Sequence, residues 1–224
     1  MGVTIGIVNY NLARFLPCAI ESAQGADELI VVDDCSTDNS VEIARQYRAK
    51  VIRHEANSGS AVQGWNELID AATQEWLFLL SADDALLPQT LGLIAEHGAD
   101  ADWMWGQLLL MDANGNDTGI WRYDGWPTTV EGCQNYMRRQ LQLYPTMIAA
   151  FRVSWLRENG LRAMSFKTTR GYADTITGWN WLKANPRLKF LSEPFARYRR
   201  WGGSESKTAA SYKAEFAEML RGEG

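Results

Sequence analysis

The chain alternates short runs of apolar, β-branched residues with stretches whose apolar positions recur at helical spacing. Two of the apolar runs are residues 3–8 (VTIGIV) and 29–32 (LIVV), and runs of this kind are typical of buried strands. Residues 16–23 between them are amphipathic, and Pro17 suits the first turn of a helix because its missing N–H has no partner there. The order of strand, helix and strand predicts a βαβ unit.

The same alternation continues through residue 80. Polar turn residues 35–40 lead into a helix that ends at Tyr47, and Asn39 with Glu42 three positions later resembles a capping box. Three further elements follow: a strand at 50–54, a helix at 60–72 and a strand at 76–80. The last (WLFLL) is almost unbroken in its apolar character, which indicates a strand covered on both faces. Strands alternating with helices predict a parallel, doubly wound sheet of the α/β class.

Beyond Pro88 the order of elements becomes mixed. The pattern predicts a helix up to His97, a strand at 103–111, helices at 130–141 and 173–183, a strand at 189–198 and a terminal helix at 209–220. The Asn114-Gly115 pair is a strong hairpin signal. The second half of the chain is therefore expected to be mixed rather than parallel.

Composition favours one globular domain over residues 1–224 and excludes several classes of function. Of the 224 residues 46% are hydrophobic and 22% are charged, a balance that buries one substantial core. The formal net charge is −5 with both signs interspersed, so no basic stripe exists to bind a nucleic acid. No apolar run approaches the roughly 20 residues of a membrane span, and the N-terminus lacks a signal-peptide pattern, so a cytoplasmic protein is expected.

Cysteine and histidine supply no recognisable site. Cys18, Cys35 and Cys133 lie far apart and form no CxxC pair, which predicts reduced, structural thiols. His54 and His97 have no metal-ligand spacing and no nucleophile signature nearby, so both are expected at the surface. Most of the 10 tryptophans are expected in the core.

Polar clusters follow three of the predicted strands, where open α/β sheets bind their ligands. The clusters are residues 9–11, the pair Asp33-Asp34 and residues 81–84. Each alone is explained by turn chemistry. Together they gather four carboxylates at one edge, where repulsion costs stability unless a cation or ligand compensates. Such carboxylates suit Mg²⁺ or Mn²⁺ with a phosphate-containing ligand, and neither a P-loop nor a dinucleotide glycine motif is present.

Four motifs resemble, in sequence and order, the nucleotide-binding half of the family 2 glycosyltransferases: VTIGIVNYN, LIVVDDCSTDNS, HEANSGSAVQGWN and WLFLLSADDALLP. The resemblance implies an inverting enzyme of the GT-A (Rossmann-like) fold, with a nucleotide-sugar-binding half at residues 1–100 and an acceptor-binding half at 101–224. It implies a UDP- or GDP-linked sugar donor and Mn²⁺ or Mg²⁺ as cofactor. It also implies a glycan, lipid-linked or other hydroxyl acceptor, in surface polysaccharide biosynthesis with peripheral membrane association.

The resemblance assigns the first polar clusters to the nucleotide. Asn9 and Tyr10 match residues around the base, and Asn11 belongs to the same cluster. Asp33 and Asp34 match the pair that reads uracil or ribose.

The resemblance assigns the later clusters to the phosphates and the metal. Asp83 matches the metal-binding carboxylate of the DxD-like motif, with Asp84 beside it. Asn57, Gly59 and Asn66 match polar residues of the intervening loop and helix, and the alternatives for them are a turn, a helix start and a buried amide.

In the second half the resemblance points to Asp174 as the catalytic base. Residues 170–175 are similar to a segment in which an acidic pair opens a helix, with Ala173 in place of the first acid. An N-cap is the structural alternative for Asp174.

The chain departs from the family pattern at two possible metal ligands. Residues 198–204 resemble a late motif that often carries histidine, and Trp201 stands at that position. Ser81 replaces the first Asp of the usual DxD. Arg199 or Arg200 is expected to stabilise charge on the diphosphate.

Two other functions stay open. A sugar nucleotidyltransferase also builds a nucleotide site on an α/β sheet, although residues 9–17 are neither glycine-rich nor basic. A degenerate glycosyltransferase that binds nucleotide sugar or glycan without turnover is favoured by Ser81, Ala173 and Trp201.

Overall fold

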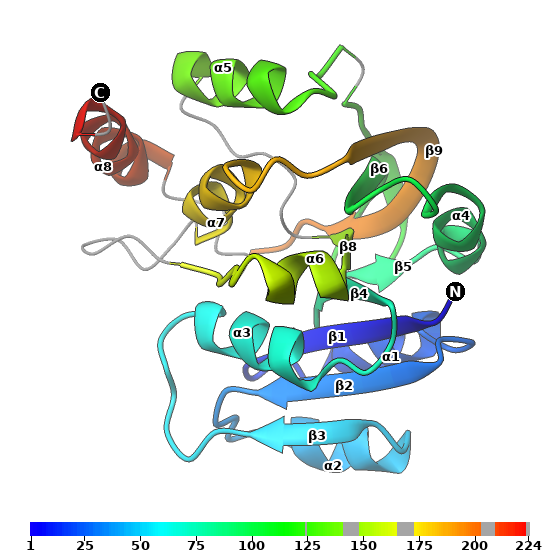
Figure 1. Cartoon of the computed structure of the whole chain (residues 1–224). Helices are drawn as coiled ribbons and strands as arrows, with labels where there is room; N and C mark the ends of the chain where they lie inside the picture. The colour runs from blue at the N-terminus through cyan, green and yellow to red at the C-terminus, as the bar shows by residue number, and fades with distance from the viewer. Residues whose placement is uncertain (124, 141–147, 165–172, 203–208, 223–224) are drawn as a thin grey trace.

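The computed structural model describes residues 1–123, 125–140, 148–164, 173–202 and 209–222, and its strands form one curled sheet (Figure 1). Four parallel strands in the order β3-β2-β1-β4 make up its first half: β1 (Val3–Asn9), β2 (Glu28–Asp33), β3 (Lys50–Arg53) and β4 (Trp76–Ser81). The predicted βαβ units and the parallel arrangement are confirmed.

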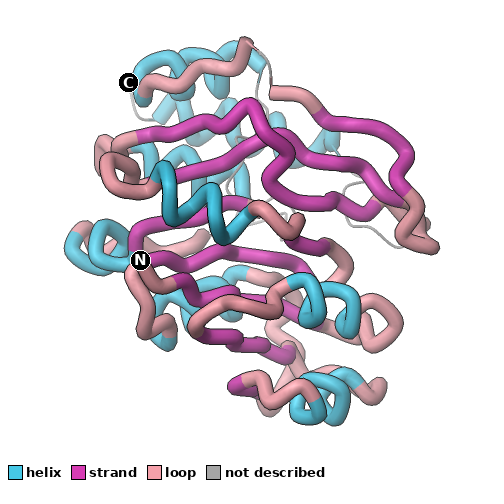
Figure 2. Tube along the Cα trace, turned by 90° about the vertical axis from the view of Figure 1, so that its right-hand side faces the viewer, coloured by secondary structure: helices cyan, strands magenta, loops and turns pink. Residues whose placement is uncertain are grey.

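Helices cover both faces of these strands (Figures 1 and 2). The helices of this half are α1 (Leu16–Ser22), α2 (Ser40–Gln46), α3 (Val62–Ala71) and α4 (Thr90–His97). Helix α3 lies on one face of β1 and β2, and α1 and α2 lie on the opposite face. Gly64 lets α3 approach the sheet, because a Cβ at this position would lie 3.0 Å from Cγ1 of Val8.

The predicted capping box before α2 is wrong. Asn39 is the N-cap residue, and its side chain makes no capping hydrogen bond. Asp38 takes this role, because its Oδ1 accepts hydrogen bonds from the backbone N (3.1 Å) and Oγ (2.6 Å) of Ser40. Oδ2 of Asp38 also accepts from the backbone N of Ala13 at 2.9 Å. The carboxylate therefore joins the start of α2 to the loop before α1.

The second half of the sheet is mixed, as predicted. Its strands are β5 (Ala85–Leu86), β6 (Trp103–Met111), β7 (Asp117–Trp121), β8 (Ala149–Arg152) and β9 (Leu188–Arg199). β8 runs antiparallel to β4 and β6, β9 runs parallel to β6, and β7 pairs with β6 across the predicted hairpin. The helices are α5 (Val130–Gln140), α6 (Val153–Glu158), α7 (Ala173–Leu182) and α8 (Ala209–Gly222). The short elements β5, β8 and α6 carried no periodicity long enough to predict them.

Aromatic side chains form much of the core of this half. Seven of the ten tryptophans are buried: Trp65, Trp76, Trp103, Trp105, Trp155, Trp179 and Trp181. The Phe151 ring packs 5.3 Å from the Trp103 ring and 4.9 Å from the Trp181 ring, measured between centroids. These contacts join β6, β8 and α7, so they fix the helix whose first turn carries Asp174.

The three cysteines are free thiols, as predicted. Among the described residues, no helix is both long enough and apolar enough to cross a membrane.

Candidate functional site

The carboxyl ends of β1, β2 and β4 meet at one edge of the sheet. In the strand register Asn9 pairs with Asp33, and Val8 pairs with Ser81. The three polar clusters predicted from the sequence therefore lie side by side. This edge is where open α/β sheets bind ligands.

Asp33 is enclosed by hydrogen-bond donors of the protein itself. Its Oδ1 accepts from Nδ2 of Asn9 at 2.8 Å, and its Oδ2 accepts from the backbone N of Ser36 at 2.9 Å. The residue is only 1% exposed. Oδ1 of Asn9 is buried without a hydrogen-bond partner. Asp33 thus holds the turn after β2, and the buried Oδ1 of Asn9 lies beside it with no hydrogen-bond partner among the described residues.

Tyr10 and Asn11 form the outer part of this cluster. Tyr10 is 47% exposed. Asn11 has a φ of 52°, and its Oδ1 accepts a hydrogen bond from the backbone N of Thr37 at 2.8 Å. Asn11 therefore ties the end of β1 to the turn after β2, and Tyr10 is presented to solvent beside it.

His54 joins Asp34 to helix α3, and the prediction of a surface histidine is wrong for this residue. The side chain of His54 is 5% exposed. Its Nδ1 lies 2.6 Å from Oδ1 of Asp34, and its Nε2 lies 2.8 Å from Oε2 of Glu67. His54 follows β3, whose carboxyl end is aligned with that of β2, and this alignment brings the ring between the two carboxylates. His97 ends α4 and is partly exposed, with 29% of its side chain accessible.

The ionisation of Asp34 and His54 follows from these contacts. Burial raises the pKa of Asp34, but hydrogen bonds from Ser58 and His54 outweigh it, so that the pKa lies below the ordinary value. Burial lowers the pKa of His54, but the hydrogen bonds and charges of Asp34 and Glu67 outweigh it and raise the pKa above 6.5. Both shifts favour an ion pair.

The loop between β3 and α3 is anchored on Asp34. The backbone N of Ser58 donates to Oδ1 of Asp34 at 2.8 Å, and Nδ2 of Asn57 donates to the backbone O of Asp34 at 3.3 Å. Gly59 has a φ of +72°, which glycine adopts without strain, and its N–H donates to Oδ1 of Asn57 at 2.7 Å. Asn57 and Gly59 therefore lie at the same edge as Asp34.

Asn66 lies apart from these residues, in the middle of α3. Its Nδ2 donates to the backbone O of Ala163 at 3.2 Å, and its Oδ1 accepts from the backbone N of Ala163 at 2.8 Å. The amide is thus paired on both sides with one backbone unit. Asn66 is only partly buried, so it has the hydrogen bonds of the buried-amide alternative without the full burial.

The turn after β4 is held by the end of β9. Oδ1 of Asp84 accepts from the backbone N of Arg199 at 2.8 Å, and Nε of Arg199 donates to the backbone O of Asp83 at 2.7 Å. Nη1 of Arg199 donates to the backbone O of Asp112 at 2.9 Å, and the residue is 3% exposed. The guanidinium of Arg199 therefore fastens the turn from inside the protein, whereas Arg200 is exposed.

The two adjacent carboxylates of this turn differ in environment. Asp84 is 3% exposed, and burial together with the charge of Asp83 raises its pKa well above the ordinary value, against the opposing effect of Arg199. Asp83 is partly exposed, and its Oδ2 accepts a hydrogen bond from Nε1 of Trp201 at 2.9 Å. Asp83 is therefore the carboxylate of this pair that a ligand can reach.

Asp174 is the second residue of α7, so it lies in the first turn of the helix rather than at a cap before it. Its Oδ1 accepts from the backbone N of Thr175 at 3.0 Å. Tyr123 is a neighbour of Asp174. Burial raises the pKa of Tyr123, and the charges of Tyr198 and Asp174 raise it further. Residues 170–172 of the predicted motif lie outside the described part of the chain.

No preassembled metal centre exists in the described ranges, where no group of three or more His, Cys, Asp or Glu side chains could hold an ion. One carboxylate oxygen of Asp83 accepts a hydrogen bond from Trp201, and the other accepts none from the described part of the chain. Mg²⁺ and Mn²⁺ commonly take one or two protein carboxylates and complete their shell with phosphate and water. Asp83 therefore fits a cation that arrives with a phosphate ligand.

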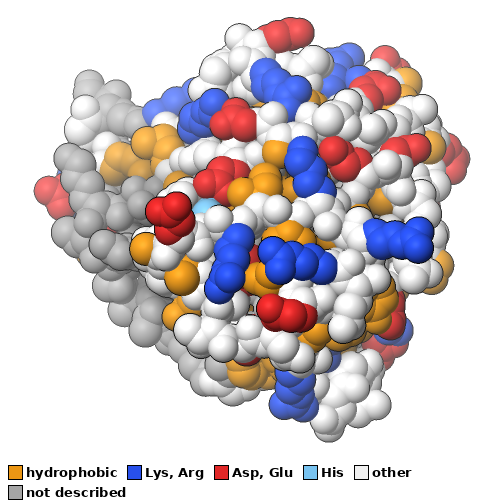
Figure 3. Space-filling view, turned by 90° about the horizontal axis from the view of Figure 1, so that it is seen from below, with side chains coloured by type: hydrophobic (Ala, Val, Ile, Leu, Met, Phe, Trp, Pro, Cys, Tyr) orange, Lys and Arg blue, Asp and Glu red, His pale blue; other side chains and the backbone are white. Residues whose placement is uncertain are grey.

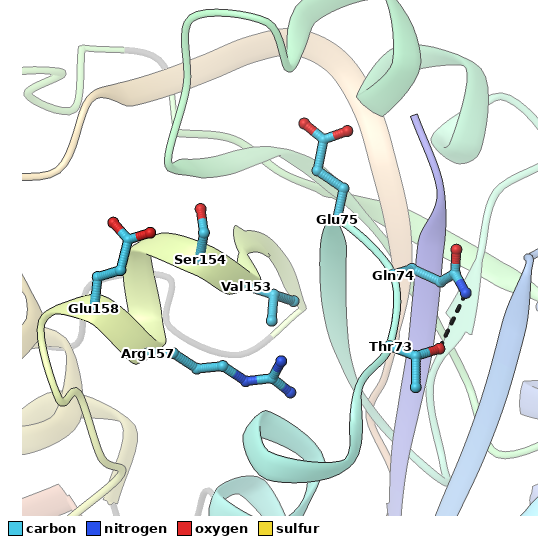
Figure 4. Close-up of a pocket in the computed structure, with 7 residues that line it drawn as sticks. All are labelled: Thr73, Gln74, Glu75, Val153, Ser154, Arg157 and Glu158. Carbon is cyan, nitrogen blue, oxygen red and sulfur yellow. Dashed lines mark hydrogen bonds between the residues drawn. The ribbon is translucent and has the colours of Figure 1, made fainter.

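Two cavities lie away from this turn. One, of about 410 Å³, lies near the amino end of β4 and is lined by Thr73, Gln74, Glu75, Val153, Ser154, Arg157 and Glu158 (Figure 4). Arg157 is already bonded there to the carbonyls of Ile69, Asp70 and Ala72. The other, of about 400 Å³, lies beside the loop into α3 and is lined by Ser58, Ser60, Val62, Gln63, Asn66, Glu67 and Asp70. Only the second borders a predicted site residue.

The surface carries no extended basic patch on the face seen in Figure 3, where acidic and basic side chains are interspersed. Both signs of charge are likewise interspersed along the sequence.

The family model described as "Glycosyl transferase family 2" matches residues 4–161. The chain is 27% identical over 237 residues to "Poly(ribitol-phosphate) beta-N-acetylglucosaminyltransferase TarS" of Staphylococcus aureus (strain Mu50 / ATCC 700699). That match covers 99% of this chain and 39% of TarS, so the chain spans well under half the length of this relative.

Two solved structures show the same fold. The crystal structure of S. aureus TarS 1–349 in complex with UDP-GlcNAc has a TM-score of 0.73 and 21% identity, and the match covers 93% of this chain and 61% of that one. The mannosyltransferase PcManGT from Pyrobaculum calidifontis, in complex with GDP-Man and Mn²⁺, has a TM-score of 0.61 and 17% identity, with coverage of 98% and 64%. The predicted GT-A fold is confirmed.

Proposed function

The chain belongs to glycosyl transferase family 2, and on this basis we propose that it transfers a sugar from a UDP- or GDP-linked donor to a hydroxyl acceptor with inversion. The observation that carries the proposal is the meeting of the Asn9, Asp33-Asp34 and Asp83-Asp84 clusters at the carboxyl ends of adjacent parallel strands. Residues 1–100 are proposed as the donor-binding half and 101–224 as the acceptor-binding half.

The nucleoside of the donor is proposed to lie against the ends of β1 and β2. The exposed ring of Tyr10 offers a stacking surface for the base. The amide of Asn9 is buried and supports this edge through its hydrogen bond to Asp33. Asn57 and Gly59 border the same edge through their bonds to Asp34 and to each other. Asp33 and Asp34 act mainly by holding these groups, since their own oxygens already accept hydrogen bonds.

The diphosphate is proposed to lie at the turn after β4. Asp83 would hold a divalent cation, Mn²⁺ or Mg²⁺, which supplies positive charge against the negative charge that develops on the leaving diphosphate. A relative of the same fold was solved with GDP-Man and Mn²⁺, which supports this assignment. Arg200 is exposed beyond β9 and is proposed to add a second positive charge, with Arg199 holding the backbone of the turn.

Asp174 is proposed as the general base. As the acceptor oxygen attacks the anomeric carbon, the bond from that carbon to the diphosphate oxygen breaks, and the hydroxyl proton passes to Asp174. The bonding electrons leave with the nucleoside diphosphate. The first turn of α7 supports an ionised carboxylate at this position, because the partial positive charge of a helix N-terminus stabilises an anion.

The acceptor and the biological setting are proposed from the relatives. TarS is named as a transferase that acts on poly(ribitol-phosphate), which supports a glycan or lipid-linked acceptor in surface polysaccharide biosynthesis. A cytoplasmic location with peripheral attachment to a membrane belongs to the same proposal. Fractionation of the cells that make the protein tests it.

One observation favours a second function, a protein that binds nucleotide sugar without turnover. The hydrogen bond from Trp201 occupies Oδ2 of Asp83, and Ser81 and Ala173 stand where further carboxylates are expected. Such a protein would bind the donor and release no product.

Release of nucleoside diphosphate from UDP- and GDP-sugars, with and without Mn²⁺ and with candidate acceptors, tests the proposal. We expect release that depends on acceptor and is lost in Asp174→Asn, with donor binding retained. Binding without release supports the second function. Formation of pyrophosphate from a nucleoside triphosphate and a sugar phosphate would instead identify a nucleotidyltransferase.

A further inference from the structure

The contacts of His54 with two carboxylates favour a protonated ring. Its Nδ1 lies 2.6 Å from Oδ1 of Asp34, and its Nε2 lies 2.8 Å from Oε2 of Glu67. A neutral imidazole carries one N–H and one lone pair, so it can donate to only one of these carboxylates. The other nitrogen would then direct its lone pair at a carboxylate oxygen. While both carboxylates are ionised, both contacts are favourable only when the ring is an imidazolium with two donors.

This imidazolium joins three elements that meet beside the candidate site. Glu67 lies on α3, His54 follows β3, and Asp34 follows β2. Asp34 in turn accepts from the backbone N of Ser58 at 2.8 Å and from its Oγ at 3.0 Å. The chain of contacts therefore runs from the helix through His54 and Asp34 into the loop of residues 55–61. That loop carries Asn57 and Gly59.

The other polar groups nearby do not replace the charge of His54. Arg53 points to the opposite side of β2, where its Nε lies 3.9 Å from Oδ2 of Asp33 and its Nη2 donates to the backbone O of Ser36. From α3, Gln63 donates to Oε1 of Glu67 at 3.1 Å, which orients that carboxylate without neutralising it. Glu55 contributes its backbone O to Cys35. Loss of the ring proton would therefore leave Asp34 and Glu67 as two carboxylates with no cation between them among the described residues.

We propose that His54, as an imidazolium, is a positioning residue that holds Asp34 and the loop of residues 55–61 in the conformation that binds the nucleoside diphosphate of the donor. This inference rests on the proposed function, since the loop affects transfer only if the donor lies beside it. One proton controls the linkage. Affinity for the nucleoside diphosphate therefore falls as the pH rises through the pKa of His54.

Titration followed by NMR tests the linkage without any ligand. The His54 imidazole signal, identified by its absence in His54→Asn, should titrate with a midpoint above 6.5, and the Ser58 amide signal should move with the same midpoint. Glu67→Gln keeps the shape of the side chain and can pair with either form of the ring, so both midpoints should fall together. A midpoint at or below 6.5 in the wild type, or a Ser58 amide that does not follow His54, overturns the proposal.

Calorimetric titration with UDP and GDP across the same pH range tests the consequence. Wild-type affinity should fall by about tenfold, the factor that 1.4 kcal/mol represents, as His54 loses its proton. Glu67→Gln should move this fall to lower pH, and the control His97→Asn should keep the wild-type profile. Affinity that is independent of pH, or a Glu67→Gln profile identical to the wild type, overturns the proposal. If neither nucleotide binds at any pH, the proposed function fails, and the NMR titration alone decides the role of His54.

Discussion

The indole N–H of Trp201 donates a hydrogen bond of 2.9 Å to Oδ2 of Asp83. The same indole packs against Phe15 with 5.0 Å between ring centroids, and the guanidinium of Arg199 lies 4.7 Å from the centroid of the Phe15 ring. Residues at the end of β9 thus hold the one accessible carboxylate of the turn after β4. A cation at Asp83 has to share this carboxylate with an indole.

The first prediction concerns this sharing. Trp201→Phe keeps an aromatic ring against Phe15 and removes the donor to Asp83, so both carboxylate oxygens become available to a cation. Half-maximal UDP or GDP binding should then need less Mn²⁺ than in the wild type, measured by calorimetric titration at several metal concentrations. An unchanged Mn²⁺ requirement would mean that the indole and the cation do not compete.

The second prediction concerns Asp83 itself. A ligand that binds only the native state shifts unfolding by mass action, so UDP or GDP with Mn²⁺ should raise the Tm. Asp83→Asn should remove the part of this rise that depends on Mn²⁺. The matched control is Asp117→Asn, because Asp117 is an exposed aspartate paired with Arg197 at 3.2 Å on the hairpin strand β7. Equal Mn²⁺-dependent shifts in both variants would exclude Asp83 as the metal ligand.

Much of the fold could be predicted from the sequence because its long elements have clear periodicity. The apolar run at 76–80 became a strand with every side chain buried, and the alternation up to residue 80 became the parallel half of the sheet. The short elements β5, β8 and α6 were missed, since two, four and six residues show no reliable period. Their positions depend on pairing with β9 and on packing against the β4 side of the sheet, which local sequence does not encode.

The sequence predicted where the site residues lie only to the extent that it predicted where the strands end. Residue order located the clusters at Asn9, Asp33-Asp34 and Asp83-Asp84, because parallel strands end at a common edge. The partners of these side chains were not predictable. Ser58 and Trp201 are far along the chain from the carboxylates of Asp34 and Asp83 that they contact. Ser36 follows Asp33 in an irregular turn, whose hydrogen bonds a periodic pattern does not predict. These donors satisfy Asp33 and Asp34, whereas the charge of Asp83 still raises the pKa of Asp84, so the repulsion that remains is confined to the turn after β4. His54 could have been noticed, since it follows a strand that ends at the same edge.

The third prediction uses the buried carboxyl group of Asp84. Its pKa is raised by burial and by Asp83, so the folded protein disfavours the ionised form at neutral pH. Asp84→Asn keeps an oxygen to accept from the backbone N of Arg199 and carries no charge. The variant should therefore raise the Tm by a few degrees at pH 7, about what 1 kcal/mol produces in a chain of this size. The advantage should disappear at acidic pH, where Asp84 is protonated as well. A lower Tm at pH 7 would show that the charge of Asp84 is needed.

The fourth prediction concerns stability and pH at His54 and Asp34. The pKa of His54 is raised in the folded state, so its contribution to stability is complete below 6.5 and is lost as the pH rises through the folded pKa. The pKa of Asp34 is lowered, so its contribution is complete above 3.8 and is lost as the pH falls through the folded pKa. The free energy of unfolding of the wild type should therefore exceed that of Glu67→Gln most clearly between pH 3.8 and pH 6.5. Urea unfolding of both proteins across the pH range measures the difference, and a constant difference would contradict the assignment.

The fifth prediction separates the structural and chemical roles of Asp174. The carboxylate accepts a hydrogen bond from the backbone N of Thr175 in the first turn of α7. Asparagine at this position keeps the shape and the acceptor oxygen, but it cannot take a proton at neutral pH. Asp174→Asn should therefore keep the Tm and the donor affinity of the wild type. Transfer to the acceptor should fall by about 10² to 10⁴, the usual value of general-base assistance.

The kinetic form of this loss identifies its cause. An interaction that matters mainly in the transition state lowers kcat and leaves donor binding unchanged. Asp117→Asn again serves as the control and should transfer sugar at the wild-type rate. If Asp174→Asn retains nearly the wild-type kcat, the base lies elsewhere. If instead its Tm and kcat fall together, Asp174 stabilises the start of α7, and the loss of transfer reflects the displaced helix rather than a missing proton acceptor.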